Sequence, residues 1–317
     1  MKHNILVLTE EFEPYKELMA AHPWPGATIS FAKDADEQSV SQADILFGSP
    51  AKIAPALEQA TNLKWVQSTW AGVEPFVKPA MRTDYKLTNV KGIFGRLIAE
   101  YALTYILAHE RHLHKHAADQ QNKAWDTINT GYLKNKTIGI IGVGSIGTDI
   151  ALLFKTLGLT VWGYTRSSEN CDQVDLYFHS SKAGQADALL EMAAGVDYLI
   201  TTMPHTPESE NMLGKAVFKA MRPSALLLNI GRGTSIIDAD LIDALESGEI
   251  AGAILDVFRQ EPLPADHPFW TTKNLTITPH TSAPSFPEDV VPIFHRNYMH
   301  FVKGEPLEYV IDFAKGY

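Results

Sequence analysis

The chain has 317 residues, of which 45% are hydrophobic and 20% are charged, and its formal net charge is −10. This length allows two domains with a core each, and the composition is that of a globular protein. The acidic balance, with bases interspersed among acids, argues against a nucleic-acid surface, which needs clustered Lys and Arg.

A single cysteine, Cys171, excludes an intrachain disulfide. No stretch approaches the roughly 20 apolar residues of a membrane helix. The first apolar run is closed by Glu10 and Glu11 and is too short for a signal peptide. These features predict a cytoplasmic protein.

Short apolar runs alternate with helical patterns, which indicates a doubly wound α/β architecture. A first series of strands is predicted at Ile5–Leu8, Ile29–Phe31, Ile45–Phe47 and Trp65–Gln67. A long helix is expected from Arg96. Six further strands are predicted at Thr137–Ile141, Thr160–Tyr164, Tyr198–Thr202, Ala225–Ile230, Gly252–Leu255 and Leu275–Thr278. A final helix is expected over Val290–Val302. The second series suits a dinucleotide-binding sheet.

A glycine-rich turn, Gly142-Val143-Gly144-Ser145-Ile146-Gly147, directly follows the predicted strand Thr137–Ile141. The first glycine permits the tight turn and the second lets the backbone approach a pyrophosphate. The third allows close packing of helix on strand. Because a strand precedes this turn and a helical pattern follows it, we interpret it as a dinucleotide site rather than a structural turn.

The end of the next predicted strand indicates which dinucleotide is used. An acid there would bind the ribose 2′-hydroxyl of NAD, whereas an arginine accommodates the 2′-phosphate of NADP. The sequence has Thr165, Arg166, Ser167 and Ser168, with no acid before Glu169. This pattern predicts NADP(H), with NAD(H) as the alternative if Arg166 is only a solvated loop residue.

Arg232 lies in Asn229-Ile230-Gly231-Arg232-Gly233, where a predicted strand ends. Its two parallel N–H groups match a carboxylate, or the carboxylate and carbonyl edge of a 2-oxo acid. His280 follows another strand end and precedes small residues that leave room for a ligand. A carboxylate such as Glu261 would stabilise its protonated form, so that it could act as an acid. The set predicts hydride transfer to a small 2-oxo acid.

These segments, with Leu255–Pro264 and His267-Pro268-Phe269-Trp270, stand in the order and approximate spacing of one family. Over nearly its whole length the chain resembles the D-isomer-specific 2-hydroxyacid dehydrogenases, and within them the glyoxylate and hydroxypyruvate reductases. The resemblance implies a homodimer whose subunits contain a Rossmann dinucleotide-binding domain (98–286). It also implies a smaller, flavodoxin-like substrate domain (1–97 plus 287–317) that the C-terminal tail completes.

The resemblance also implies roles for individual residues. Arg232 would clamp the substrate, His280 would be the acid/base and Glu261 its partner. The substrate would further contact Trp70, Ala71, Gly72 and Val73, whose backbone amides would receive its carboxylate. The implied cofactor contacts are Gly142, Gly144, Ser145, Ile146, Gly147, Thr165, Arg166, Ser167, Pro204, Ile230 and, at the nicotinamide carboxamide, Asp256.

Some features depart from the family pattern. Trp70 and Glu74 flank the Ala71–Val73 segment where a glycine and an aspartate are more common, which leaves the exact substrate open. His205 stands where an apolar residue is common. Two alternatives therefore remain: a dehydrogenase of a bulkier 2-hydroxy acid that uses NAD, and a non-catalytic dinucleotide-sensing regulatory protein. The complete Arg232, Glu261 and His280 set favours the enzyme.

His109, His112 and His116 have a spacing at which they could share one helical face. Histidines that converge on one face can bind a zinc ion. No cysteine accompanies them and Arg111 and Lys115 add positive charge, so we expect a solvated or subunit-contacting helix and no metal.

Overall fold

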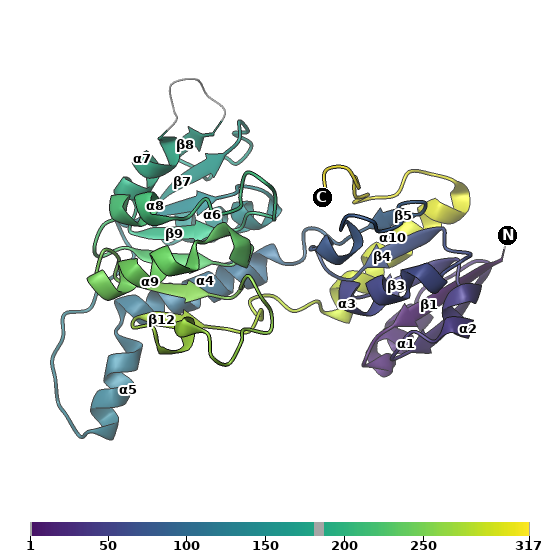
Figure 1. The fold of residues 1–317 in the computed structure, drawn as a ribbon, viewed down its shortest axis with the longest axis horizontal. Helices are drawn as coiled ribbons and strands as arrows, with labels where there is room; N and C mark the ends of the chain where they lie inside the picture. Colours follow the sequence, from purple (N-terminus) through teal and green to yellow (C-terminus); the bar gives the residue numbers. More distant parts are fainter. Residues whose placement is uncertain (1, 181–186, 317) are drawn as a thin grey trace. The chain divides into compact units, whose positions relative to one another are not determined.

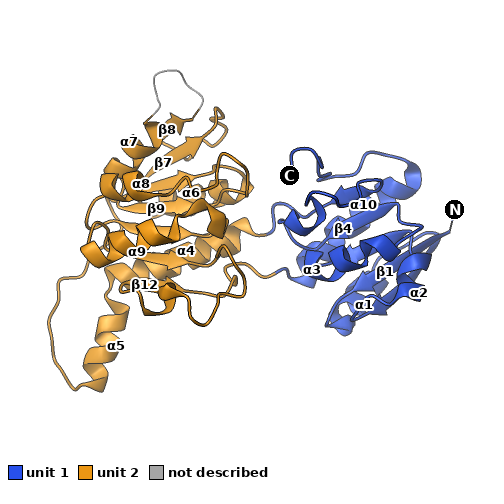
Figure 2. Ribbon diagram, viewed as in Figure 1, with its two compact units in different colours: residues 1–93, 285–317 blue, residues 94–284 orange. Residues whose placement is uncertain are grey.

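A computed structural model describes residues 2–180 and 187–316 and divides into two compact units (Figures 1 and 2). Unit 1 comprises residues 1–93 and 285–317, and unit 2 comprises residues 94–284. The boundaries expected from the sequence, 97/98 and 286/287, lie a few residues later. Helix α4 begins at Gly95 and belongs entirely to unit 2. Ser285 belongs to unit 1, where its hydroxyl donates to the Thr69 carbonyl at 2.6 Å.

Unit 1 contains a five-stranded parallel sheet in the order β2-β1-β3-β4-β5. Its strands are β1 (His3–Leu8), β2 (Ala27–Ala32), β3 (Ile45–Gly48), β4 (Trp65–Ser68) and β5 (Lys86–Thr88). The central strands β3 and β4 are buried along their whole length, as expected of parallel strands covered on both faces. The strand order is the flavodoxin-like one, which confirms that part of the predicted fold class.

Helices cover both faces of this sheet. On one face α1 (Phe12–Ala20) packs with α10 (Pro287–Lys303), whose Phe294 stacks on Phe47 with ring centroids 4.3 Å apart. The opposite face is covered by α2 (Glu37–Gln42), α3 (Pro50–Ile53) and the 3-10 helix η1 (Ala54–Gln59), and a short 3-10 helix, η2 (Glu74–Phe76), follows β4. The C-terminal segment completes unit 1, since Ile311 also donates to Leu87 of the edge strand β5.

Unit 2 contains a seven-stranded parallel sheet in the order β12-β11-β10-β9-β6-β7-β8. Its strands are β6 (Thr137–Ile141), β7 (Thr160–Thr165), β8 (Leu176–His179), β9 (Tyr198–Thr201), β10 (Leu226–Asn229), β11 (Gly252–Leu255) and β12 (Leu275–Ile277). Counted from β6, six of them follow the Rossmann order 3-2-1-4-5-6, and β12 extends the sheet. The strand order reverses between β6 and β9, so ligands are expected at the carboxyl ends of these strands.

The helices of unit 2 lie on both faces of its sheet (Figure 1). α4 (Gly95–Glu110) packs on α6 (Ser145–Thr156). The other face is a core to which α7 (Ala188–Gly195), α8 (Lys215–Ala220) and α9 (Asp238–Ser247) contribute. Two 3-10 helices, η3 (Gly233–Ser235) and η4 (Pro268–Thr271), follow β10 and β11. A further helix, α5 (Leu113–Gln121), projects from this body, and none of its nine residues is buried.

Two strands were missing from the sequence prediction, and both lie at sheet edges. β5 has only three residues and begins with the exposed Lys86, and β8 begins with the exposed Leu176. Neither has the continuous apolar run by which a buried parallel strand is recognised.

His109, His112 and His116 do not share one helical face. His109 ends α4, whereas His112 is the N-cap of α5 with a left-handed backbone (φ +52°), so the three belong to two helices. Within residues 2–180 and 187–316, no cluster of three His, Cys, Asp or Glu side chains could hold a metal ion.

Across the same described residues, no helix has both the length and the apolar character needed to cross a bilayer.

Candidate active site

The glycine turn between β6 and α6 has the shape that a dinucleotide requires. Gly142 has φ +95°, a left-handed conformation that favours glycine. A Cβ on Gly147 would lie 2.3 Å from the Gly142 carbonyl oxygen, so the helix can approach the strand only without a side chain there. A Cβ on Gly144 would have no atom of the described residues within 4 Å. The turn therefore leaves open space at the N-terminus of α6, which fits a pyrophosphate.

This contrast predicts different results for two alanine substitutions. Gly144→Ala should leave the melting temperature nearly unchanged but weaken dinucleotide binding, because the new methyl group occupies open space. Gly147→Ala should destabilise unit 2, because its methyl group would overlap the Gly142 carbonyl. Thermal unfolding and dinucleotide titration of both variants test this; equal stability of the two would contradict the geometry.

The end of β7 presents the predicted cofactor-choice residues in two different environments. Arg166 and Ser167 are exposed. Thr165 is 7% exposed, and its hydroxyl donates to the Ser168 carbonyl at 2.7 Å. The Thr165 side chain is therefore engaged within the loop, and Arg166 and Ser167 are the side chains presented to solvent.

The loop after β9 packs against the segment that carries Arg232. A Cβ on Gly231 would lie 2.7 Å from the Met203 carbonyl oxygen, so the two backbones touch. Pro204 accepts a hydrogen bond from the Ser209 hydroxyl at 2.7 Å, and His205 Nδ1 lies 2.9 Å from the Thr234 hydroxyl. Ile230, the other predicted contact here, is 7% exposed directly after β10. These residues form one layer at the carboxyl ends of β9 and β10.

Hydrogen bonds at its carbonyl and its guanidinium fix the conformation of Arg232. Its carbonyl accepts hydrogen bonds from Asn229 Nδ2 at 3.0 Å and from the Ser235 hydroxyl at 2.8 Å, and its Nη1 donates to Gly231 O at 2.7 Å. Gly233 allows the close approach of the next loop, because a Cβ there would overlap the backbone of Phe258. The Arg232 segment and the segment leading to Glu261 are thus in direct contact.

Glu261 and His280 form a hydrogen-bonded pair. His280 Nδ1 lies 2.8 Å from Glu261 Oε2, and Glu261 Oε1 accepts from the Phe258 amide at 2.8 Å. Because a carboxylate only accepts, Nδ1 donates, and Nε2 is the nitrogen through which His280 would exchange a proton with a substrate. Both side chains are partly exposed, at 40% and 36%, so the pair is accessible to a ligand.

The pair also sets its own protonation. The hydrogen bond to Glu261 raises the pKa of His280 above its ordinary value, against the opposing effect of burial. Burial alone would raise the pKa of Glu261, but hydrogen bonds from His280 and the Phe258 amide hold it below its ordinary value. The positive charge of Arg232 opposes the shift at His280 and favours the carboxylate of Glu261. Arg232 therefore lies within electrostatic reach of the pair, and the three predicted residues come together.

Asp256 fixes the turn that carries His280. This carboxylate is fully buried and accepts from the Thr278 hydroxyl at 2.6 Å, the Thr281 amide at 2.8 Å and the Ser282 amide at 3.0 Å. His280 itself has φ +54°, an uncommon conformation for a residue with a side chain. The bonds of Asp256 hold it there. Its expected contact with the nicotinamide carboxamide stays a prediction.

Sequence reasoning missed a support of this turn. The Tyr101 hydroxyl lies 2.7 Å from the Thr278 hydroxyl, which continues the chain from α4 to Asp256. Burial, as its largest cause, raises the pKa of Tyr101 far above the ordinary value, so the phenol stays protonated. No local motif signals a contact between residues 177 positions apart.

The predicted substrate loop lies in unit 1, after β4. Its backbone is held by Ser68, whose hydroxyl lies 3.0 Å from both Trp70 N and Trp70 O. Asn89, which is 5% exposed, donates to Ala71 O at 2.7 Å. Gly72 and Val73 complete the loop before η2. Buried polar groups thus hold the conformation of the segment whose amides are expected to receive a carboxylate.

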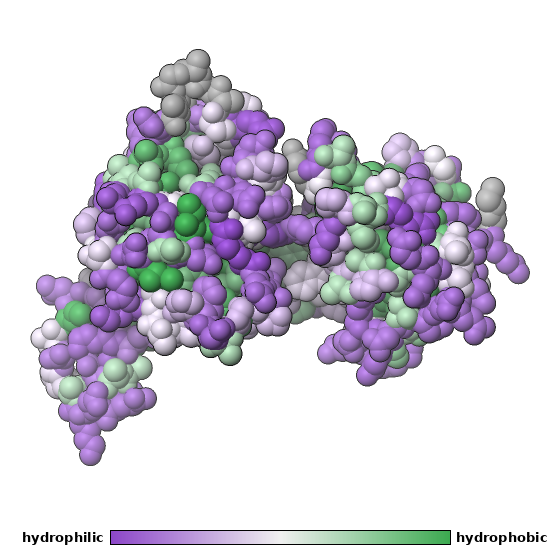
Figure 3. All heavy atoms as spheres, viewed as in Figure 1, coloured by the Kyte–Doolittle hydropathy of each residue, from purple (hydrophilic) through white to green (hydrophobic). Residues whose placement is uncertain are grey.

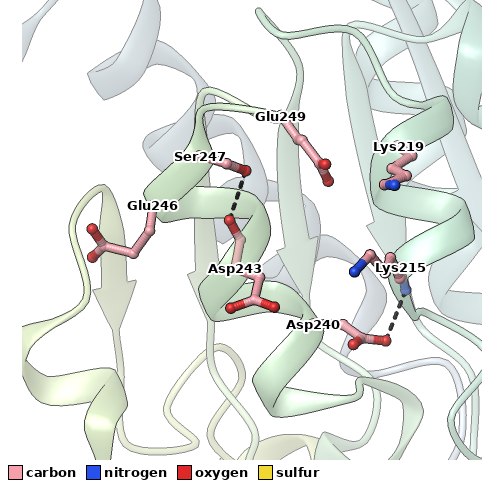
Figure 4. A pocket seen from close by; sticks show the side chains of 7 residues that line it. All are labelled: Lys215, Lys219, Asp240, Asp243, Glu246, Ser247 and Glu249. Atoms are coloured by element: carbon pink, nitrogen blue, oxygen red, sulfur yellow. Dashed lines mark hydrogen bonds between the residues drawn. The ribbon is translucent and has the colours of Figure 1, made fainter.

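A hollow between α8 and α9 lies outside this set (Figure 4). Its lining residues are charged or polar: Lys215, Lys219, Asp240, Asp243, Glu246, Ser247 and Glu249. Asp240 accepts from the Lys215 amide at 2.8 Å, and Ser247 bonds to its own helix. It contains none of the predicted catalytic or cofactor residues, so we assign it no part in the site.

A Rossmann sheet with an open glycine turn, an arginine and a carboxylate–imidazole pair defines a dinucleotide-dependent oxidoreductase. Residues 103–282 match the family described as D-isomer specific 2-hydroxyacid dehydrogenase, NAD binding domain. The chain belongs to the D-isomer specific 2-hydroxyacid dehydrogenase family, as the sequence resemblance predicts.

Relatives and solved structures agree with this assignment. The chain is 36% identical to glyoxylate/hydroxypyruvate reductase A of Serratia proteamaculans over 69% of its length and 68% of the relative. A crystal structure of a D-isomer specific 2-hydroxyacid dehydrogenase family protein from Aeromonas salmonicida is 39% identical with a TM-score of 0.93, covering 99% of this chain and 100% of that one. The NADPH-dependent glyoxylate/hydroxypyruvate reductase of Sinorhizobium meliloti, solved with NADP and sulfate, is 26% identical with a TM-score of 0.87 and full coverage of both chains.

Proposed function

We propose that this protein is an NADPH-dependent reductase of small 2-oxo acids of the glyoxylate and hydroxypyruvate type, which yields D-2-hydroxy acids. The observation that carries the proposal is the 2.8 Å contact between His280 Nδ1 and Glu261 Oε2 within electrostatic reach of Arg232. The names of relatives that share 36% and 26% identity support the substrate class. A dinucleotide sensor without catalysis would not require this acid/base pair.

The residues of unit 2 divide the chemistry between them. A bound nicotinamide dinucleotide supplies the hydride for the carbonyl carbon. Arg232 orients the substrate through parallel hydrogen bonds to its carboxylate and carbonyl edge. His280 donates the proton from Nε2 to the carbonyl oxygen as that oxygen gains charge, and Glu261 stabilises the imidazolium before the transfer. Asp256 keeps the imidazole in place through the turn that it holds.

The cofactor preference rests on the end of β7. Arg166 and Ser167 would bind the 2′-phosphate, since a guanidinium and a hydroxyl are suitable partners for phosphate oxygens. The S. meliloti structure, which contains NADP, supports this choice. NADH should be used less efficiently.

The substrate contacts in unit 1 are part of the same proposal. The amides of Ala71, Gly72 and Val73 would receive the substrate carboxylate, and Trp70 would limit the size of the group attached to the carbonyl carbon. A preference for glyoxylate and hydroxypyruvate over branched 2-oxo acids would support this role of Trp70. Trp70→Ala should weaken that preference.

The pKa of His280 predicts the pH dependence of reduction. Reduction needs the imidazolium, so kcat/KM should be constant at low pH and fall as pH rises through the raised pKa of His280. Glu261→Gln replaces the carboxylate that raises the pKa of His280 by a neutral amide, so the falling limb should move to lower pH. The pH profile of NADPH oxidation with glyoxylate measures this shift. An unchanged limb would exclude Glu261 as the partner that sets this pKa.

The decisive assay of the proposed function follows NADPH and NADH absorbance with glyoxylate or hydroxypyruvate. Faster oxidation of NADPH supports the full proposal. Faster oxidation of NADH keeps the enzyme class and overturns the role of Arg166. Turnover only with larger 2-oxo acids would overturn the substrate class. Binding of a dinucleotide without turnover on any 2-oxo acid would favour the sensor.

We also propose that the protein is a cytoplasmic homodimer in which the arm formed by residues 111–132 contacts a second copy. The arm exposes three large side chains: Leu113 by 57%, Trp125 by 96% and Tyr132 by 63%. Its surface mixes hydrophilic and hydrophobic residues (Figure 3). Exposed aromatic side chains of this size are common at protein interfaces. Trp125→Ser should increase the monomer fraction in analytical ultracentrifugation; an unaffected dimer or a monomeric parent protein would contradict the assignment.

A further inference from the structure

His179 is a fully buried histidine that the proposed mechanism does not use. It is the last residue of β8 and has 0% exposure. Its Nε2 donates to Glu169 Oε1 at 2.7 Å, and its Nδ1 lies 3.1 Å from the Thr165 hydroxyl. A buried imidazole that bonds two side chains of another segment fixes that segment, because the ring has few rotamers and no solvent to exchange with.

The fixed segment is the loop that carries the 2′-phosphate candidates. Thr165 ends β7, and its hydroxyl, with a single proton, lies 2.7 Å from the Ser168 carbonyl as well as 3.1 Å from His179 Nδ1. His179 therefore connects to Thr165 at one end of the loop and to Glu169 at the other. Arg166 and Ser167 lie between these two anchors and are exposed. A loop that is ordered before binding loses less entropy when it takes up its ligand.

The bond to Glu169 also has an electrostatic consequence. In Rossmann domains that use NAD, an acid at this strand end binds the ribose hydroxyls. Glu169 is the first acid after β7, and its side chain is 54% exposed. A carboxylate that could turn toward the ribose would repel a 2′-phosphate and accept from a 2′-hydroxyl. The bond to His179 restrains it on the side of β8.

We propose that His179 is the positioning residue for dinucleotide choice, which orders the Arg166–Ser168 loop and restrains the Glu169 carboxylate so that a 2′-phosphate is accepted. This inference rests on the proposed preference for NADPH. His179 would then be a second determinant of cofactor specificity beside the phosphate-binding side chains. It lies on β8, a strand that the sequence prediction missed.

The test compares His179→Phe with the parent protein. The ring volume is nearly kept, but both hydrogen bonds are lost. We expect the Kd of NADPH and of 2′,5′-ADP to rise about tenfold, because the Arg166–Ser168 loop is no longer ordered and the Glu169 carboxylate is no longer restrained. The Kd of NADH and of 5′-AMP should stay within about twofold on the same scale. Fluorescence titration of the four ligands gives the ratio without any catalytic step.

Further variants distinguish positioning from a general loss of structure. Tyr177→Phe lies on the same strand and loses the hydroxyl that bonds to Cys171 N at 3.0 Å and to Cys171 O at 3.2 Å; it should leave the NADPH to NADH ratio unchanged. The double variant His179→Phe, Glu169→Gln is compared with His179→Phe alone. The NADPH affinity that it regains measures the repulsion between the Glu169 carboxylate and the 2′-phosphate. Thr165→Val keeps the shape of the side chain and breaks the other anchor, so it tests the same link if His179→Phe does not fold.

The outcomes separate this inference from the proposed function. A parent protein that binds NADPH and NADH equally overturns the proposed cofactor choice and this inference with it. A parent that prefers NADPH, with an unchanged ratio in His179→Phe, overturns only the inference. Equal weakening of all four ligands would assign His179 a structural role and overturn the inference as well.

Discussion

Replacing His280 by asparagine should lower kcat for the reduction of glyoxylate by about 10²–10⁴-fold, the usual contribution of a general acid. Asparagine tolerates the left-handed backbone at this position, where φ is +54°. Its amide can also occupy the place of Nδ1 and donate to Glu261. The variant therefore keeps the turn and its carboxylate partner, and loses only the group that delivers a proton.

Binding measurements identify this loss as a chemical one. The Kd of NADPH should change less than about twofold, because the glycine turn and the β7 loop are untouched. His280→Ala should be as inactive and less stable, since alanine at positive φ adds backbone strain. His300→Ala, in the last turn of α10 and outside all proposed contacts, is the matched control and should keep parental activity. Parental turnover in His280→Asn would remove His280 from the proton transfer.

Much of the fold was predictable because parallel strands in a doubly wound protein are buried on both faces. Leu226–Leu228 and Ile45–Phe47 are continuous apolar runs for this reason. The edge strands β5 and β8 lack that signal, so they were missed. The break between α4 and α5 was also hidden, because the left-handed His112 that separates them is not a glycine or proline.

The candidate site was predictable where backbone demands and chemistry coincide. Gly142 and Gly147 are glycines for steric reasons that the turn imposes, and the need of an acidic imidazolium for a carboxylate, together with the family resemblance, predicts the pairing of Glu261 with His280. The supports of the site were not predictable in this way. Tyr101 reaches Thr278, and His179 reaches Glu169, from elements whose packing no local pattern specifies. Such side chains supply hydrogen-bond partners to buried polar groups, and their positions depend on a fold that other residues determine.

Replacing Arg232 by alanine should lower kcat/KM for glyoxylate about 10–10²-fold, from the loss of charged hydrogen bonds worth roughly 1.5–3 kcal/mol. KM should rise, and kcat should fall to the extent that the guanidinium orients the carbonyl as well as the carboxylate. Arg232→Lys keeps the charge without the planar pair of donors, so it should recover only part of the loss. Steady-state kinetics of both variants give the two constants separately.

The pH profile adds a signature that a misfolded loop would not produce. The charge of Arg232 opposes the raised pKa of His280. Arg232→Ala should therefore move the falling limb of kcat/KM to higher pH, whereas Glu261→Gln should move it to lower pH. Arg232→Lys, with its charge retained, should leave the limb close to its parental position. Opposite shifts from the two neutralising substitutions would indicate that the arginine and the glutamate act on the same imidazole, and shifts of the same sign would contradict that arrangement.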